Sequence, residues 1–415
     1  MNAHTERDTA GGAMTGRRRL IYFSSVPYAS YAQRPHFMAK AFADNGFDEI
    51  LWIDPYPTRL PTFADLKRLR KSNAEVAHPV DPRVHVVRPP ALPIEPLPMS
   101  GVVNRFAKWR AVRNQLKAFA RGADHCVLGV GRPSKLADWA LRHVPHGRSF
   151  ADVLDNFPAF YRGVSRLSMH MRLRALLRKA DDVYCSSSAL ALDVRRKRPD
   201  AVTILNGYPT AGLPEPSDAG QRRYIGYVGT IADWFDWPLV QALAEALPDV
   251  PIRLIGPEFI ARPANLPANI ELFGEMPRER VASMVQEFAV GLIPFRINAL
   301  TAGVDPIKFY EYRSLGVPVW STAFGEMHHR DHAHGVTHIA PGSNWSTLWD
   351  SARAGVAKAE DIASFRLEVD WSRRFDPVLA RSHMVSAVPK MQAGIDMLPL
   401  SPRPSEPGHH VMKER

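Results

Sequence analysis

The sequence contains very little cysteine: Cys126 and Cys185 are the only two in 415 residues. Two cysteines cannot form a disulfide framework, and their spacing does not match a metal site. A reducing, cytoplasmic location is therefore expected. Long apolar runs are also missing, since no stretch approaches the roughly 18–20 residues that a membrane-spanning helix needs. The polar segment 1–19 lacks the apolar core of a signal peptide, so residues 1–18 are expected to form a disordered leader.

The overall composition is that of an ordinary globular protein. Hydrophobic residues make up 45% of the chain, charged residues 23% and aromatic residues 9%. These values exclude a mostly disordered chain, a coiled coil and a disulfide-stabilised scaffold. The length by itself favours two or three domains.

Acidic residues are scarce in the first half. Residues 1–205 carry 33 basic and 18 acidic side chains, a net charge of +15, whereas residues 206–415 carry a net charge of −4. Much of the excess lies in two stretches that favour basic amphipathic helices, with Arg105, Lys108 and Arg113 in the first and Arg166 and Arg172 in the second. These stretches are interpreted as a solvated face, or as an acceptor-binding or membrane face for anionic lipid. Nucleic acid ranks last, because no recognised nucleic-acid-binding motif is present.

Strand-like and helix-like segments alternate through both halves of the chain. The pattern predicts strands over residues 20–24, 49–54, 126–130, 149–154, 182–186, 202–205, 224–228, 252–255, 270–273, 290–293 and 317–320. Helices are expected between many of them, for example over residues 135–143, 238–246 and 306–315. Such alternation is typical of parallel sheets with right-handed crossovers.

The predicted architecture is two doubly wound α/β domains that face a cleft. Residues 206–217 are rich in glycine, proline and small residues and are interpreted as the connection between them. The expected domains are 19–208 and 209–372, followed by a helix over 373–396 that returns to the first domain. The Pro- and His-containing end, 397–415, is expected to be a disordered tail. Ligands of such folds bind at the carboxyl ends of the strands.

The segment 304–319 is the most informative one. Lys308 would lie in the first turn after Pro306, where exposed backbone N–H groups and the helix dipole also favour an anion such as a diphosphate. Glu311 is three residues further on, on the same face, where it can accept hydrogen bonds from a sugar diol. The alternative is a simple salt bridge between the two.

This segment resembles a known family signature. Residues 306–319 match the pattern Pro-x-Lys-x-x-Glu-Tyr/Phe-x-x-x-Gly-x-Pro-Val of GT-B glycosyltransferases in the family-4-like group. The resemblance extends over roughly residues 20–375, and within the group it is greatest to teichuronic-acid glycosyltransferases and to exopolysaccharide glucuronosyltransferases of the xanthan type. It implies a GT-B architecture, with an acceptor-binding first domain and a nucleotide-sugar-binding second domain.

Further blocks support the resemblance. The Gln-Arg-Pro-His block at 33–36 is similar to the Arg-Pro-His entry of the group, and residues 227–236 resemble the first strand and loop of its second domain. The resemblance implies that Gly229 lets the backbone approach a phosphate and that Asp233 contacts donor or acceptor. It places Met276 near the base and Glu275 near the ribose, with Lys308 at the diphosphate and Glu311 at the donor sugar.

Asp155 is the candidate general base. It follows a predicted strand, and the resemblance aligns it with a carboxylate suspected of this role in the glucuronosyltransferases. A carboxylate beside the acceptor hydroxyl can take its proton during attack on the anomeric carbon. The alternative is a helix N-cap, which the nearby Pro158 also suits. One departure concerns Gly303, which stands eight residues before Glu311 where classical family-4 enzymes keep a first glutamate.

No Asp-x-Asp motif with flanking strands is present, so metal-independent catalysis without a cofactor is expected. The predicted function is transfer of a sugar from a nucleotide donor, expected to be UDP-linked, to a lipid-linked saccharide in cell-surface or exopolysaccharide biosynthesis. Glucuronate or a hexose is the expected sugar, and the expected location is the inner face of the plasma membrane. The alternatives are a sugar-nucleotide 2-epimerase of the same architecture and a non-catalytic saccharide-binding protein.

Overall fold

The computed structural model describes residues 16–58, 80–92, 94–97, 100, 103–104, 108–217, 220, 222–355 and 357–384. The leader expected over 1–18 lies almost entirely outside these ranges. Arg105 and the tail expected over 397–415 lie wholly outside them. No helix in the described ranges is long and apolar enough to cross a membrane.

The first lobe is built on a parallel sheet in which apolar strands are covered on both faces. Within the described residues the sheet has seven strands in the order β3-β2-β1-β4-β5-β6-β7. The strands are β1 (Arg18–Phe23), β2 (Glu49–Ile53), β3 (Val84–Val87), β4 (His125–Val130), β5 (Arg148–Val153), β6 (Asp182–Cys185) and β7 (Val202–Thr203). Near-continuous apolar runs such as β4, all of whose residues are buried, are typical of strands inside a parallel sheet.

Helices cover both faces of this sheet, and each face forms its own hydrophobic core. The helices in the described part of the lobe are α1 (Arg34–Asp44), α4 (Arg110–Arg121), α5 (Lys135–His143), η1 (Phe157–Phe160), α6 (Gly163–Lys179) and α7 (Ser188–Arg195). Alternate strand residues point to opposite faces. Ile21 and Leu51 therefore pack with Leu116 of α4 and Leu136 of α5. Their neighbours on β1 and β2, Leu20 and Trp52, belong to the other core with α1.

The second lobe repeats the same plan. Its strands, in the described part of the chain, are β8 (Tyr224–Val228), β9 (Ile252–Ile255), β10 (Ile270–Phe273), β11 (Phe288–Ile293), β12 (Val319–Ser321) and β13 (Val336–His338). They form one parallel sheet in the order β10-β9-β8-β11-β12-β13. The helical segments that the structure describes in this lobe are α8 (Trp237–Ala246), α9 (Arg278–Gln286), α10 (Ile307–Ser314), η3 (Gly325–His329), η4 (His332–His334) and α11 (Trp345–Ala354). The expected fold class, two doubly wound α/β domains, is confirmed.

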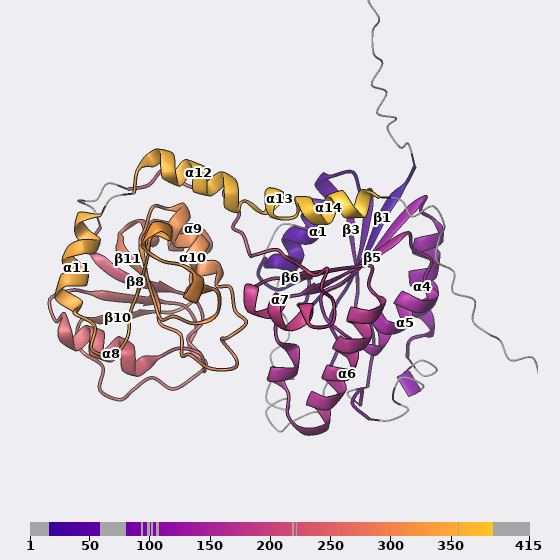
Figure 1. Ribbon diagram of the computed structural model, residues 1–415, viewed down its shortest axis with the longest axis horizontal. Coiled ribbons are helices and arrows are strands. Elements are labelled where there is room, and N and C mark those ends of the chain that lie inside the picture. The colour runs from indigo at the N-terminus through magenta and orange to yellow at the C-terminus, as the bar shows by residue number, and fades with distance from the viewer. Residues whose placement is uncertain are drawn as a thin grey trace, which may run out of the picture.

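The C-terminal helices lead the chain back to the first lobe, as Figure 1 shows in yellow. These helices are α12 (Ala359–Val369), α13 (Trp371–Arg374) and α14 (Asp376–His383). Trp371 stacks on Phe37 of α1, with ring centroids 5.2 Å apart. Phe375, Val378 and Leu379 then complete the core beneath α1. The first lobe therefore depends on residues from the far end of the chain.

In each sheet the strand order reverses at one place. The reversal lies between β1 and β4 in the first lobe and between β8 and β11 in the second. In open α/β sheets the crevice beyond the carboxyl ends of the strands at such a switch point is the usual ligand site. Both switch points are therefore the places to look for a functional site.

Candidate active site

Two glycines occupy the switch point of the second lobe. Gly229 follows β8 with φ +137°, and Gly256 follows β9 with φ +139°. The Gly229 N–H donates to the carbonyl of Ile255 at 2.8 Å. A Cβ at Gly256 would overlap the carbonyl group of Gly229. Only glycine allows both this conformation and this approach, and the pair leaves the backbone at the strand ends open to a ligand.

Lys308 lies directly over this glycine. It is the second residue of α10, after Pro306 at the N-cap, and a Cβ at Gly229 would overlap its Nζ and Cε. The ammonium group is 5.3 Å from the ring centroid of Tyr227 and 5.6 Å from that of Phe295. The positive end of the helix dipole and the lysine therefore act at the same point.

The charge of Lys308 is poorly compensated. Among the described residues, no carboxylate lies within ion-pair distance of Nζ, so the alternative of a salt bridge with Glu311 does not form. Burial lowers the pKa of Lys308 from its usual value, and the negative charge of Glu311 opposes this only in part. A buried cation without a counter-ion is costly, and an anionic ligand would relieve that cost.

Glu311 lies at the boundary between the lobes. Its Oε1 accepts a hydrogen bond from the Tyr208 hydroxyl at 3.0 Å. Tyr208 belongs to the segment that connects the lobes, and its N–H donates to the carbonyl of Val369 at 3.0 Å. The carboxylate is therefore oriented by the connecting segment as well as by α10.

The other predicted donor residues lie in loops after β8 and β10. Glu275 is exposed, and it accepts a hydrogen bond from the hydroxyl of Tyr31 in the first lobe. Met276 is partly buried against the core of the second lobe. Asp233 is exposed, while the nearby Asp236 caps α8 by accepting from the N–H of Leu239. Their roles toward a donor stay predictions.

Asp155 follows β5 at the carboxyl edge of the first sheet. Its carbonyl accepts from the N–H of Phe157 at 2.9 Å, where η1 begins. The N-cap of η1 is Asn156, so Asp155 does not serve as the cap. In the described part of the chain its carboxylate has no hydrogen-bond or ion-pair partner. Burial raises its pKa from 3.8 to about 7, a value suited to a general base at neutral pH.

The Arg-Pro-His block at 33–36 serves the structure of the lobe boundary. Arg34 is buried and forms an ion pair with the buried Asp152 of β5 at 2.9 Å. It also donates to the carbonyl of Ile204 at 2.7 Å. Two residues on, the N–H of Asn206 donates to Asp305 Oδ2 in the second lobe at 2.7 Å. These contacts hold the connection between the lobes close to both sites.

A second contact between the lobes explains the departure at Gly303. The carbonyl of Gly303 accepts from the Ser187 hydroxyl at 2.8 Å, and a Cβ at Gly303 would lie 3.2 Å from Leu190 of α7. Buried Glu326 caps the same helix: it accepts from the N–H of Ser188 at 2.8 Å and from its hydroxyl at 2.9 Å. A side chain at position 303 would therefore press against Leu190 of α7.

Comparisons with solved structures identify the fold that the two lobes form. Sucrose-phosphate synthase from Thermosynechococcus elongatus aligns with a TM-score of 0.60 at 15% identity, over 88% of this chain and 99% of that one. HepE of Anabaena in complex with UDP-glucose aligns with a TM-score of 0.58 at 12% identity, over 88% and 98% of the two chains. An alpha-glucosyltransferase bound to UDP-glucose and DNA aligns with a TM-score of 0.54 at 12% identity, over 88% and 99%. The chain has the GT-B fold.

Sequence comparison gives a narrower match. The chain is 23% identical over 165 residues to TuaH of Bacillus subtilis (strain 168), which is named as a teichuronic acid biosynthesis glycosyltransferase. The matched segment is 35% of this chain and 41% of that protein. No protein-family model matches the sequence. The resemblance to GT-B glycosyltransferases therefore holds for the fold along most of the chain.

The proposed basic face of this GT-B protein needs a correction. Arg172 is buried and forms an ion pair with Glu95, so the prediction that it lies on that face is wrong. Arg113 is partly buried and lies over the ring of Trp139, 4.2 Å from its centroid. Lys108 and Arg166 are exposed as predicted.

The second basic stretch carries an exposed apolar stripe on η1 and α6, of which sequence reasoning identified the amphipathic helix but not the full set of exposed side chains. Side chains spaced i, i+4, i+7 and i+11 are each more than half exposed: Phe160 (53%), Val164 (57%), Leu167 (61%) and Met171 (56%). Four exposed arginines belong to the same segment, namely Arg162, Arg166, Arg174 and Arg178. The signal was available in the sequence, since no acidic residue occurs between Asp155 and Asp181.

Other residues near the site were also missed. Gly256 directly follows a predicted strand, as Gly229 does, and that position is the signal that could have found it. Tyr31 and Glu326 have no such local signal. In the part of the chain that the structure describes, no group of three or more His, Cys, Asp or Glu side chains is placed to hold a metal ion.

Proposed function

We propose that the protein is a glycosyltransferase that uses a nucleotide-sugar donor, UDP-linked, with glucuronate or a hexose as the sugar. The observation that carries the proposal is the ammonium of Lys308 beside Gly229, at the switch point of the second lobe, which has no ion-pair partner among the described residues. That pairing of cation, helix N-terminus and open backbone suits a diphosphate. Neighbours of the same fold have been solved with UDP or UDP-glucose bound.

The proposed reaction needs few protein groups. A hydroxyl oxygen of the acceptor attacks the anomeric carbon while its proton passes to the carboxylate of Asp155. The bond from that carbon to the diphosphate oxygen breaks, and the electron pair leaves with the nucleoside diphosphate. Lys308 and the start of α10 stabilise the developing negative charge. The two lobes contribute mainly by holding donor and acceptor in position.

The acceptor in this proposal is a lipid-linked saccharide used in cell-surface or exopolysaccharide biosynthesis. The enzyme would act in the cytoplasm, bound peripherally to the inner face of the plasma membrane. The support is the stripe on η1 and α6, which combines exposed apolar side chains with exposed arginines. This pattern is typical of helices that lie in the interface of an anionic bilayer.

The proposal is tested in two steps. Thermal unfolding is measured with UDP-, GDP- and ADP-sugars, and a UDP-sugar is expected to raise the midpoint because a ligand of the native state stabilises it. The UDP-sugar that does so is then incubated with membrane extract containing lipid-linked saccharides, and transfer of the labelled sugar to lipid is expected. An isomerised sugar formed without acceptor would instead indicate the 2-epimerase. Absence of any nucleotide binding would favour a non-catalytic saccharide-binding protein.

A further inference from the structure

A pocket lies at the switch point of the first lobe. It occupies the same position in its sheet as the Gly229 site does in the sheet of the second lobe. β1 ends at Phe23 and β4 at Val130, and the pocket opens beyond these two ends and that of β2. Its lining residues are Phe23, Ser24, Ile53, Asp54, Pro55, Tyr56, Thr58, Arg132 and Ser134. The position is the one at which α/β sheets bind ligands, and no residue of this pocket has a role in the donor site.

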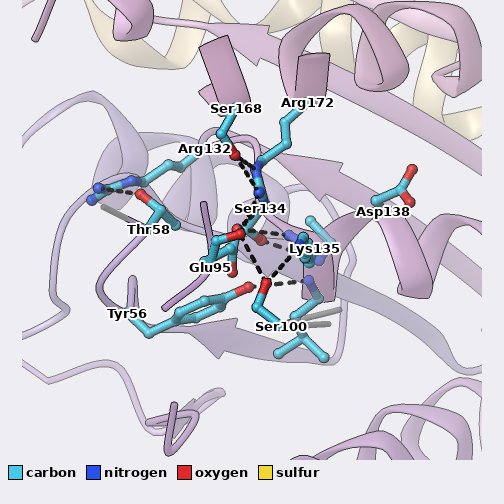
Figure 2. A network of polar contacts seen from close by, with 12 residues as sticks. Tyr56, Thr58, Glu95, Ser100, Arg132, Ser134, Lys135, Asp138, Ser168 and Arg172 are labelled. Carbon is cyan, nitrogen blue, oxygen red and sulfur yellow. Dashed lines mark hydrogen bonds and ion pairs between the residues drawn. The ribbon is translucent and has the colours of Figure 1, made fainter. Parts of the chain in front are cut away.

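Arg132 is the cation of this pocket. Its Nη2 donates to Thr58 Oγ1 at 2.9 Å and to the Tyr161 hydroxyl at 2.7 Å. Both hydroxyl-bearing residues are themselves buried. Figure 2 shows Arg132 reaching Thr58 at one side of a polar network, while Arg172 meets Glu95 at the centre. The guanidinium is therefore held in place by neutral groups.

The charge of Arg132 has no counter-ion among the described residues. No carboxylate there lies within ion-pair distance, and its Nε is buried without a hydrogen-bond partner. Other buried or partly buried arginines of the same lobe do have carboxylates: Arg34 pairs with Asp152 and Arg148 with Asp182. A guanidinium that is oriented but unpaired is suited to bind phosphate or carboxylate oxygens.

The nearby carboxylates are already engaged. Asp54 lines the pocket, but it accepts from the N–H of Tyr28 at 2.8 Å and from Trp52 Nε1 at 2.9 Å, and it pairs with Arg88 at 3.3 Å. Glu95 is paired with Arg172 and accepts from the N–H of Lys135 at 3.0 Å (Figure 2). Neither of these carboxylates pairs with Arg132, so among the described residues its guanidinium is held without an ion-pair partner.

We propose that Arg132 binds a phosphate group carried by the acceptor. This rests on the proposed function, which makes the first lobe the acceptor side. The Tyr161 hydroxyl that orients Arg132 belongs to the residue directly after Phe160, the first member of the exposed apolar stripe. A phosphate bound here would therefore lie next to the surface proposed to meet lipid. The same chemistry serves a phosphate attached to a lipid carrier or one on a soluble sugar.

The test is calorimetric titration of two phosphate probes, glucose 1-phosphate and farnesyl phosphate, into protein saturated with UDP. UDP occupies the donor site, so the probes report on the first lobe. Arg132→Gln is expected to weaken binding of the accepted probe tenfold or more, and Arg132→Lys to weaken it less. Arg196→Gln at the end of α7 is the matched control, since it removes an exposed positive charge of the same lobe outside the pocket and outside the proposed basic face, and it is expected to change the affinity less than twofold.

Each outcome decides the proposal. Arg132-dependent binding of farnesyl phosphate alone supports the proposal and indicates a phosphate on a lipid. Arg132-dependent binding of glucose 1-phosphate alone supports it and indicates a phosphate on a soluble sugar. Arg132-dependent binding of both probes also supports it. Absence of probe binding, or equal losses in Arg132→Gln and Arg196→Gln, overturns it. Unchanged UDP affinity and unfolding midpoint show that the variants are folded. Failure of UDP itself to bind would contradict the proposed function instead.

Discussion

Lys308 in the second lobe and Asp155 in the first are both desolvated by burial, and their pKa values are shifted in opposite directions. Burial lowers the pKa of the lysine and raises that of the carboxyl. In both cases burial opposes the charged form, and among the described residues neither group has an ion-pair partner. Ionisable groups in this condition are often functional, because a substrate supplies the partner that the protein withholds.

The pKa of about 7 at Asp155 predicts a pH dependence. If the carboxylate is the base, turnover rises as the pH increases through 7 and then levels off. Stability changes in the opposite sense, because the native state binds a proton between pH 4 and 7 that the unfolded state releases. Asp155→Asn is therefore expected to abolish transfer while raising stability at pH 9, by at most about 4 kcal/mol.

The measurement is the pH–rate profile together with denaturant unfolding at pH 5 and pH 9. UDP affinity of Asp155→Asn serves as the control and should match that of the native protein. Normal turnover by this variant would remove Asp155 as the base. If Asp155→Asn had a lower unfolding free energy at pH 9 than the native protein, burial would not destabilise the ionised carboxylate.

Residue roles were predictable only where the chemistry is local. Lys308 could be placed because Pro306, the lysine and Glu311 lie within one short segment whose spacing is visible. The burial of Arg172 could not be predicted, because its partner Glu95 is 77 residues away and belongs to a loop. The role of Arg132 was hidden for the same reason, since Thr58 and Tyr161 meet only in the fold.

At the scale of elements, buried strands were predicted well because their apolar runs are long and bounded by turns. The strand expected at 126–130 is β4, and that at 224–228 is β8. β3 and β13 were not predicted: each is short and lies at a sheet edge. α7 was also missed, although its N-cap is local: the Ser187 side chain accepts from the N–H of Leu190, and Glu326 adds a distant contact to the N–H of Ser188.

In the proposed function, membrane binding depends on α6. Leu167→Asp places a charge in the middle of its exposed apolar stripe, and Leu367→Asp makes the same change on α12, where the leucine is 59% exposed. Burying a leucine contributes about 1.5–3 kcal/mol, so Leu167→Asp is expected to weaken binding to phosphatidylglycerol-containing vesicles about tenfold or more. Leu367→Asp is expected to leave it unchanged. Co-sedimentation at low salt measures both.

Two results would count against this surface. One is failure of the native protein to bind anionic vesicles at low ionic strength, where the arginines act most strongly. The other is an equal effect of the two aspartate variants, which would mean that the stripe on α6 has no special part in binding. Neither result would bear on nucleotide binding in the second lobe.

At the scale of the whole molecule, polar contacts hold the two GT-B lobes together at the start of α7. Glu326 there accepts two hydrogen bonds from Ser188 of the other lobe. Glu326→Gln keeps the size of the side chain but removes the charge that favours the helix N-terminus. The expected loss of stability is about 0.5–2 kcal/mol, with a larger radius of gyration in solution scattering of the unliganded protein.

The matched control is Glu368→Gln at the far end of α12, where the side chain is 71% exposed and pairs loosely with Arg374 at 3.6 Å. It is expected to change neither stability nor the radius of gyration. If Glu326→Gln behaves like this control, the contact at α7 does not determine how the lobes are held. The packing of α14 on the first lobe would then contribute more to holding the two lobes together.

Calorimetric titration of UDP into the native protein and into Lys308→Gln tests the central claim most directly. The account predicts binding by the native protein and a loss of about tenfold to a hundredfold in the variant, because a charge-assisted hydrogen bond contributes about 1.5–3 kcal/mol. Lys358→Gln removes an exposed lysine of the same lobe and should bind UDP normally. Equal affinity in Lys308→Gln and the native protein would contradict the account.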